Sequence, residues 1–391
     1  MTDSNRTIVE IHVIQTTGMG NLNRDDTGSP KSVVYGGAMR ARVSSQAWKR
    51  PTREMFDRFF DDKDLGVRTK RVVKVLADRI VERNGDIAPE DAAALAESVL
   101  SKGAGIALDK PRAKKGTDED ASNDDVLKES KYLLFLGNRQ YDRLADLAVE
   151  AYSQGNTDDA IKSDKKRIKK IVADDTAVDI ALFGRMVADD TDLNVDAATQ
   201  VAHAISVQAI EPESDFFTAV DDLKKNSVDE GDAGAAMMGD VEFNAATFYR
   251  YANVDANRLN DTLGDVQASA KAVAAFVQSF VSSIPTGKIN SFAHATLPEL
   301  VLITVRDTQA VNLVGAFERP VEPDYVQHAT EALVKREQEL ERAYGITPVQ
   351  SWAIRVGDDT EAVDELVPKT SSLREIADEL SELVSSRLSQ E

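Results

Sequence analysis

The alternation of apolar and polar residues near the amino end predicts a short sheet. Residues Thr7–Gln15 are rich in β-branched side chains that alternate between two faces, which is typical of a strand. Two shorter strand-like pieces follow at Ser32–Tyr35 and Met39–Ser44, separated from the first strand by clustered Gly, Asn, Asp and Pro. These segments predict strands joined by an irregular loop.

Apolar residues then recur at helical spacing. Trp48 and Phe56 fall on the apolar side of a helix that Ser44 or Ser45 can cap. Pro51 lies inside this pattern, so it either kinks the helix or marks a restart at its first turn.

The middle of the chain has a mainly helical pattern. Helices are predicted from about Lys70 to Asp179, interrupted by the polar, low-complexity stretch Asp109–Asp125, which we expect to be a mobile loop. The run VDIALFGRM at Val178–Met186 is interpreted as a strand, and AATQVAHAISVQAI at Ala197–Ile210 as a helix or a strand-flanked helix. We interpret the helical region as an insertion between two halves of a sheet domain.

The carboxyl half returns to mixed patterns. Glu211–Phe243 departs from regular periodicity, and no element is predicted within its part Lys224–Asp240. Strands are predicted at Thr247–Val254 and Leu300–Arg306. Helices are predicted at Ala268–Ser282, Pro323–Ala343 and Ser371–Leu388. The order of elements favours an α+β sheet domain of ferredoxin-like type that carries insertions.

Composition narrows the classes of protein and of site. The 391 residues include no cysteine, which excludes a disulfide framework, a zinc–thiolate site, an iron–sulfur cluster and a thiol nucleophile. No run of about 18 apolar residues occurs, and no amino-terminal segment resembles a signal peptide, so we expect a cytoplasmic protein.

The charge is unevenly distributed. The formal net charge is −20, yet Gly20–Arg53 holds seven basic and two acidic residues, whereas Val321–Glu391 holds sixteen acidic and seven basic ones. Such a field can direct an anion to one place on an acidic protein. Adaptation of a whole proteome to salt is an alternative cause of the acidity, but it does not explain the basic cluster. That cluster is either a solvated charged face or a track for backbone phosphates.

Candidate catalytic groups are few. His12, His203, His294 and His328 lie outside metal-ligand spacing and are interpreted as structural, and no common hydrolase or kinase motif occurs. The adjacent Asp25 and Asp26 favour turn capping, although a magnesium-dependent ribonuclease using both carboxylates is the alternative function. No cofactor and no metal are expected.

Several long motifs resemble one known family. They are LNRDDTGSPKSVVYGGAMRARVSSQAWKR at 22–50, DIALFGRM at 179–186, AHAI at 202–205, DFFTAVDDL at 215–223 and FYRYANV at 248–254. In these motifs the chain closely resembles the Cascade backbone subunit, CasC type, of type I-E CRISPR systems. The likeness is weakest in the helical insertion and in the polar loop at 109–125.

The resemblance implies an RRM-like palm, a helical fingers insertion and a thumb hairpin. The corresponding ranges are 1–58, 179–210 and 244–391 for the palm with its C-terminal helices, 59–178 for the fingers and 211–243 for the thumb. It implies a protein without enzymatic activity that polymerises along the spacer of a CRISPR RNA. Its partners would be that crRNA, the target DNA strand paired to the guide, identical neighbouring subunits and the other Cascade subunits.

The resemblance also implies two sets of site residues. Those implied to contact crRNA phosphates are Arg24, Lys31, Arg40, Arg42, Ser44, Gln46, Lys49 and Arg50. Those implied to form a thumb and wedge beside a displaced nucleotide are Met186, Phe217, Thr218, Val220 and Met238. An apolar side chain inserted at a step stops continuous stacking and kinks the strand, which is the physical reason for such a wedge.

Overall fold

The computed structural model describes residues 6–111, 127–187, 191–219, 237–367 and 370–390. Contacts within the chain divide it into two compact units. The first unit comprises Met1–Met55, Gln200–Ala256 and Val273–Glu391, and the second comprises Phe56–Thr199 and Asn257–Ala272. Each unit is described by itself below.

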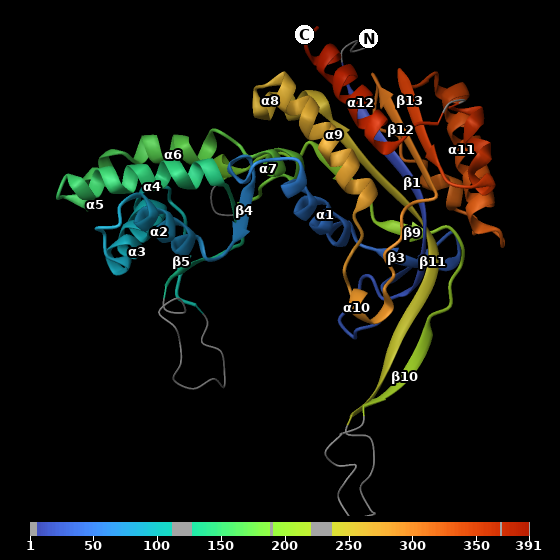
Figure 1. Ribbon diagram of the computed structural model, residues 1–391, viewed down its shortest axis with the longest axis horizontal. Helices are drawn as coiled ribbons and strands as arrows, with labels where there is room; N and C mark the ends of the chain where they lie inside the picture. Colours follow the sequence, from blue (N-terminus) through green and yellow to red (C-terminus); the bar gives the residue numbers. More distant parts are fainter. Residues whose placement is uncertain (1–5, 112–126, 188–190, 220–236, 368–369, 391) are drawn as a thin grey trace, which may run out of the picture. The chain divides into compact units, whose positions relative to one another are not determined.

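The first unit is built on a large sheet. Its strands are β1 (Ile8–Gly20), β2 (Ser32–Tyr35), β3 (Ala38–Val43), β9 (Ala204–Ser206), β10 (Glu213–Ala219), β11 (Met237–Asp255), β12 (Leu300–Arg306) and β13 (Gln350–Arg355). They follow the order β13-β12-β1-β11-β9-β3-β2, with β10 and the short β8 (Thr199–Val201) also paired to β11. Strand β1 is central because it pairs antiparallel with both β11 and β12 (Figure 1).

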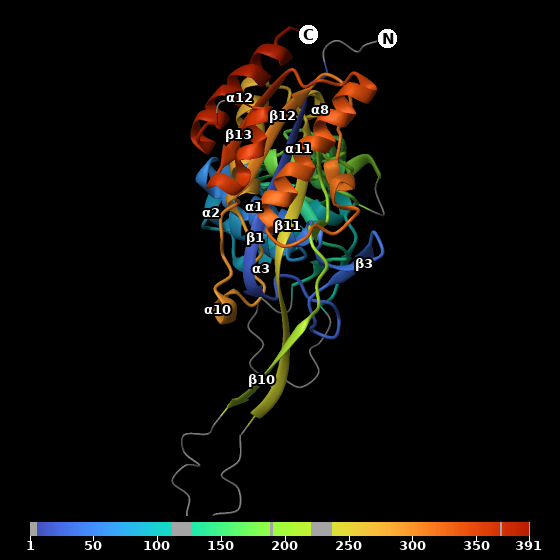
Figure 2. The ribbon, with the colours of Figure 1, turned by 90° about the vertical axis from the view of Figure 1, so that its right-hand side faces the viewer.

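Helices cover both faces of this sheet. They are α1 (Ser45–Glu54), the last part of α9 (Val266–Ser282), α10 (Ile289–Phe292), α11 (Tyr325–Tyr344) and α12 (Leu373–Leu388), with 3-10 helices at Leu313–Phe317 and Asp358–Glu365. Helix α11 lies against one face, and α9 and α12 lie against the other (Figures 1 and 2). On that other face the Trp352 indole donates to Glu379 of α12 at 2.6 Å. Both faces of β1 are therefore buried over most of its length.

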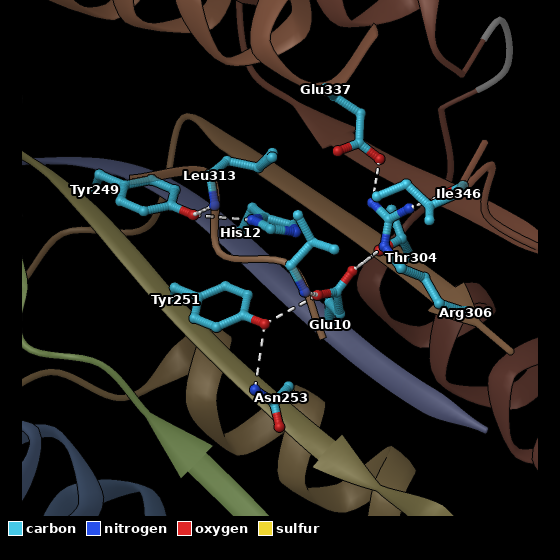
Figure 3. Close-up of polar contacts among 11 residues, drawn as sticks. Glu10, His12, Tyr249, Tyr251, Asn253, Thr304, Arg306, Leu313, Glu337 and Ile346 are labelled. Carbon is cyan, nitrogen blue, oxygen red and sulfur yellow. Dashed lines mark hydrogen bonds and ion pairs between the residues drawn. The ribbon is translucent and has the colours of Figure 1, made fainter. Parts of the chain in front are cut away.

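A buried polar network joins the sheet to α11 (Figure 3). Arg306 lies between Glu10 and Glu337, and all three side chains are at most 2% exposed. Glu10 also accepts hydrogen bonds from the Tyr251 hydroxyl at 2.9 Å and from the Thr304 hydroxyl at 3.0 Å. The burial of each charge is thus offset by an opposite charge and by hydrogen bonds, which is the condition under which buried ions are tolerated.

The second unit is mainly helical. Its helices are α2 (Val72–Arg83), α3 (Pro89–Ser98), α4 (Asn138–Ser153), α5 (Thr157–Ser163), α6 (Lys165–Ala173) and α7 (Val178–Phe183), with most of α8 (Ala256–Leu263), 3-10 helices at Met55–Arg58, Asp62–Asp64 and Thr191–Leu193, and a π-helical turn at Val99–Gly103. Two small sheets pair β4 (Gly66–Thr69) with β7 (Leu134–Gly137) and β5 (Leu108–Asp109) with β6 (Glu129–Ser130). Apolar side chains of α2, α3, α4 and α6 form its core.

Many elements follow the sequence-based expectations. The strands predicted at 7–15, 247–254 and 300–306, and the helices predicted at 268–282, 323–343 and 371–388, are confirmed. The helix ends shift by one or two residues, whereas β1 continues to Gly20 and β11 begins as early as Met237. Helix α1 starts after Ser44 and continues through Pro51 to Glu54, where a 3-10 turn takes over. None of the helices in the described ranges is both long and apolar enough to cross a membrane.

Several assignments were wrong. The run predicted as a strand at 178–186 forms helix α7 up to Phe183, because a short apolar run fits a buried helix as well as a strand. Residues 197–210 contain strands β8 and β9 instead of a helix. Within the helical region, 134–137 form strand β7, and strand β13 was missed altogether. The stretch 237–240, predicted without an element, begins β11, whereas 112–126 and 220–236 lie outside the described residues.

The ranges given to palm, fingers and thumb stay predictions. The chain is an α+β protein whose first unit contains an antiparallel sheet. The second unit begins at Phe56 and ends at Thr199, with a return at Asn257–Ala272. Its boundaries therefore differ from those of the predicted fingers insertion at both ends.

We expect Arg306→Met to lower the free energy of unfolding of the first unit by about 3–5 kcal/mol, because it leaves two buried carboxylates without their cation. Fluorescence of Trp48 and Trp352, which both belong to the first unit, measures this during denaturant unfolding. The matched control is Arg355→Met, which breaks the partly exposed pair with Asp364 (3.2 Å) and should cost less than about 1 kcal/mol. Equal effects of the two variants would contradict the importance given to the network.

Candidate nucleic-acid interface

The β2–β3 hairpin is closed by a two-residue turn of Gly36 and Gly37. Their φ angles are +60° and +79°, and Tyr35 pairs directly with Ala38, which defines the type I′ geometry that favours glycine at both positions. A Cβ atom on Gly36 would lie 1.5 Å from the Glu318 carbonyl oxygen. The turn therefore docks closely against the segment that follows Leu313–Phe317.

The loop that precedes this hairpin is shaped by Asp25. The carboxylate of Asp25 accepts hydrogen bonds from the Thr27 amide (2.9 Å), the Thr27 hydroxyl (2.7 Å) and the Ser29 amide (3.0 Å). These bonds, with that of the Thr27 hydroxyl the strongest, lower the pKa of Asp25. Together with Gly287, the loop lines an open hollow of about 510 Å³.

Asn21 ties this loop to the start of the β10–β11 ribbon. Its buried side-chain amide donates to the Gly28 carbonyl and to the Glu242 carbonyl, both at 3.0 Å. Near the same point the rings of Phe243 and Phe292 lie 5.8 Å apart. One amide thus connects the loop that carries Arg24 to the strand that carries Met238.

Helix α1 carries three of the predicted contact residues. Ser44 is at its N-cap position, but its side chain makes no capping bond, and its amide donates to the Asn23 side chain at 2.9 Å. No acidic residue lies in the first turn of the helix. Gln46 is exposed and Lys49 is half-buried. The positive end of the helix dipole therefore faces no acidic side chain of its own first turn.

Trp48 anchors this helix to the sheet. Its indole packs against the buried guanidinium of Arg250 with 3.8 Å between the guanidinium carbon and the ring centre, and Phe280 lies on the same guanidinium at 4.5 Å. Burial lowers the pKa of Arg250 to about 9. This cation–π contact fixes the side of α1 opposite Gln46.

The predicted basic residues lie in different environments. Arg24 is exposed, whereas Lys31, Arg42 and Lys49 are half-buried. In the part of the chain that the structure describes, no carboxylate forms an ion pair with any of these four cations. Arg50 differs from them because its guanidinium binds Glu54 at 2.8 Å in an exposed i,i+4 pair. Four positive charges are thus left without a negative partner in the described chain.

Lys49 is the most informative of the four. Burial alone lowers the pKa of its ammonium group, because a half-buried charge loses solvation without gaining a neighbour of opposite sign. An anion that bound beside Lys49 would compensate this loss.

Arg40 differs in its environment from the other predicted contact residues, and its contact with phosphate stays a prediction. The side chain is fully buried, and its guanidinium donates to the carbonyl groups of Ser206 (2.8 Å), Val207 (3.0 Å) and Phe317 (2.9 Å). These bonds hold β3 to the end of β9 and to the 3-10 helix. In this structure Arg40 supports the hairpin and does not present its charge to solvent.

The predicted thumb residues lie on a two-stranded ribbon. Strand β10 pairs with the first part of β11, and both views show this ribbon extending beyond the rest of the sheet (Figures 1 and 2). Thr218 pairs with Met238, and Phe217 pairs with Gly239. Because cross-strand partners share a face and successive residues alternate, Met238 and Phe217 lie on opposite faces. Val220 lies outside the described residues.

The two faces of the ribbon differ in exposure. Met238 is 65% exposed, and Phe216, diagonal to it on the same face, is 61% exposed. Phe217 is half-buried, and its ring lies so close to Gly239 that a Cβ there would be 2.9 Å away. Sequence reasoning missed Phe216, although strict alternation along DFFT places it beside Thr218.

Met186 belongs to the second unit and is 84% exposed. It follows Arg185, which is buried and donates to the carbonyl groups of Leu193 (2.6 Å) and Val172 (3.1 Å). The Met186 side chain is therefore not part of the core of this unit. Tyr132 and Leu133 are also exposed, and together with Met186 they line a small, mainly apolar pocket.

The geometry does not favour the carboxylate pair as a metal site. Asp25 is occupied in shaping its own turn. Within the described ranges, no group of three or more His, Asp and Glu side chains is arranged to hold a metal ion.

Comparisons with known proteins agree on one kind of protein. The model of a family described as CT1975-like protein matches residues 9–381. A solved chain titled "CRISPR RNA-guided surveillance complex, pre-nicking" is 33% identical, with 96% of this chain and 100% of that chain covered and a TM-score of 0.79. Another, titled "CRISPR RNA-guided surveillance complex", is 30% identical, with 96% and 99% covered and a TM-score of 0.70. No curated protein matches the chain.

We expect Arg40→Leu to lower the free energy of unfolding by about 3 kcal/mol, because several buried carbonyl groups lose a charged donor. Arg50→Leu is the control: it removes an exposed i,i+4 pair and should cost less than about 0.5 kcal/mol. Denaturant midpoints measured by tryptophan fluorescence give both values. An Arg40→Leu protein that kept its stability but lost RNA binding would instead support the predicted contact of Arg40 with a phosphate.

Proposed function

The chain belongs to the CT1975-like protein family, and from this we propose that it is the RNA-binding backbone subunit of a Cascade-type CRISPR surveillance complex. The two similar solved chains, each with nearly its full length covered, are components of CRISPR RNA-guided surveillance complexes and support this proposal. The ligand we propose is the sugar–phosphate backbone of a crRNA.

One observation carries the proposal: Lys49 is a half-buried cation without an ion-pair partner in the described chain. Desolvating a charge without pairing it costs free energy, so such a residue is expected where an external anion completes the pair. Lys31 and Arg42 repeat the pattern in the same unit. In a protein with a net charge of −20, this concentration of unpaired cations favours a phosphate ligand.

The proposed mode of recognition is backbone positioning. Lys and Arg side chains that contact phosphates fix register without reading bases. Watson–Crick pairing between the guide and a target DNA strand would then supply sequence specificity. We propose that identical subunits line up along the RNA, and that the other Cascade subunits, which bind or process the crRNA ends and flank the filament, complete the complex.

The motif resemblance supports a finer assignment within this proposal. It assigns the protein to the type I-E systems, located in the cytoplasm. The first unit would contain an RRM-like palm and, as the β10–β11 ribbon, the thumb, whereas the second unit would form the fingers. Met186, Phe217, Thr218, Val220 and Met238 would act beside displaced nucleotides.

We assign no catalytic role to the chain. The alternative of a metal-dependent ribonuclease needs Asp25 and Asp26 to coordinate a cation. The three hydrogen bonds accepted by Asp25 give that carboxylate a structural task instead. RNA incubated with the protein and Mg²⁺ should therefore stay intact.

We expect Lys49→Glu to abolish assembly on crRNA while leaving the protein folded, because a carboxylate there repels phosphate. The control is Lys335→Glu, which reverses an exposed lysine on α11 and should assemble normally. Coexpression with crRNA followed by size-exclusion chromatography and absorbance at two wavelengths measures assembly.

Salt dependence provides the quantitative check on the same pair. The affinity of wild-type protein should fall with salt with a slope of about −0.7 per phosphate contacted, and Lys49→Glu should reduce that slope. Normal assembly by Lys49→Glu, or a wild-type protein that elutes without nucleotide, would refute the proposed function.

The ribbon generates a further expectation. Phe216→Ala combined with Met238→Ala removes the exposed apolar face and should erase the regular protection pattern along bound RNA. Each change is at an exposed position and should alter stability by less than about 0.5 kcal/mol. Phe217→Ala tests the opposite face. Nuclease footprinting measures the pattern, and an unchanged footprint in both proteins would contradict the wedge.

A further inference from the structure

His203 lies among the unpaired cations of the first unit. It precedes β9 and is exposed, and its Nδ1 is 3.1 Å from a terminal nitrogen of Arg42 on β3. The Arg42 backbone amide donates to the Lys31 carbonyl at 2.9 Å, and the Arg42 Nε donates to the Ser32 carbonyl at 3.2 Å. The imidazole and the guanidinium are therefore in contact, and the ammonium group of Lys31 is near enough for its charge to act on the imidazole.

The contact with Arg42 fixes the tautomer of the histidine. A guanidinium group only donates hydrogen bonds, so Nδ1 must accept and cannot carry a proton. The proton of the neutral ring is then on Nε2. Protonation of Nδ1 and the hydrogen bond from Arg42 exclude each other, because two donors cannot share that bond.

The charges of the described residues that shift the pKa of His203 are positive. Burial lowers this pKa, and Arg42 and Lys31 lower it further. On the neighbouring strand β11, the backbone carbonyl of Tyr251 accepts from the Ala202 amide at 2.9 Å. A cluster of two cations and a neutral imidazole is arranged to change state when an anion arrives.

We propose that His203, Lys31 and Arg42 form one phosphodiester-binding site in which His203 exchanges its hydrogen bond from Arg42 for a proton when the anion binds. In the empty site, neutral His203 holds the Arg42 guanidinium in place. When a phosphodiester enters, Arg42 turns its donor to a phosphate oxygen, and the vacated Nδ1 takes a proton from solvent. The imidazolium then adds a third positive charge beside the phosphate.

The binding consequence is a dependence on pH. Each bound phosphodiester takes up part of a proton at His203, so binding tightens as the pH falls. The gain is limited to about tenfold for each unit by which binding raises the pKa of His203. The proposal rests on the proposed function for the source of its ligand, an RNA backbone.

Two variants separate charge from geometry. His203→Asn keeps an acceptor near the Nδ1 position but cannot take up a proton, and His203→Ala removes both properties. Affinity for a labelled single-stranded RNA, measured between about pH 8 and pH 6, should rise severalfold for wild type and stay flat for His203→Asn. At the upper pH, where His203 stays neutral, neither variant should bind more weakly than wild type, because the hydrogen bond from Arg42 is released on binding.

A second measurement does not require RNA. Dimethyl phosphate keeps a single charge across this pH range, and histidine ring resonances can be followed by NMR, with that of His203 identified by its absence from the His203→Asn spectrum. Dimethyl phosphate should raise the pKa of His203, whereas His328 on α11 should not respond.

The outcomes distinguish the two claims. RNA binding that is equal and pH-independent in wild type and His203→Asn, with no response of His203 to dimethyl phosphate, would overturn the site and leave the proposed function standing. A response to dimethyl phosphate without any RNA binding would support the site and refute the proposed function.

Discussion

The ion pairs of Arg306 with Glu10 and Glu337 are the interaction on which the first unit depends. They connect the central strand β1, near the amino end of the chain, to the neighbouring strand β12 and to helix α11 in its carboxyl part. Burial by itself would lower the pKa of Arg306, but the two carboxylates outweigh it and the pKa is raised. For Glu337 the effect of burial prevails and raises its pKa to about 6. The arrangement is specific because neither carboxylate is tolerated there without the arginine.

The same network constrains the strands that lead to the interface. Tyr251 on β11 donates to Glu10, and the Tyr249 hydroxyl lies 2.9 Å from His12. Burial lowers the pKa of His12 to about 4, so the ring is neutral and serves only as a hydrogen-bonding group. Because β11 continues from this network into the ribbon, the position of the ribbon is set by contacts deep in the sheet. The surface residues of the ribbon thus depend on polar groups buried in the sheet.

The parts of the fold that were predictable share a physical feature. Leu300–Arg306 is buried on every residue, and its mainly apolar, β-branched sequence identified it. Long helices such as α11 show their period clearly. Short runs such as 178–183 satisfy either period, and their identity is decided by tertiary packing. Strand β13 was not predicted, because its partly exposed residues form neither a continuous apolar run nor a clear periodic pattern.

The sequence identified the basic residues of the candidate site, but not which of their side chains point to the surface. Arg40 and Arg42 are two residues apart on one strand, so the sequence places them on the same face. The sequence does not show that Arg40 reaches the carbonyl groups of Ser206 and Val207. Nor does it show that Arg42 reaches His203. Whether a cation is paired depends on residues that are distant in the sequence and that folding brings close. These neighbours are visible in the structure and not in the sequence.

The single amide of Asn21 has a mechanical consequence. Because its two hydrogen bonds hold the loop and the base of the ribbon together, they couple the position of the ribbon to that of the loop. In the proposed assembly, each subunit would therefore keep a fixed distance between the place where it holds the RNA strand and the place where it interrupts it. In a row of such subunits, the repeat length along the strand would be a property of protein geometry, the same for every guide.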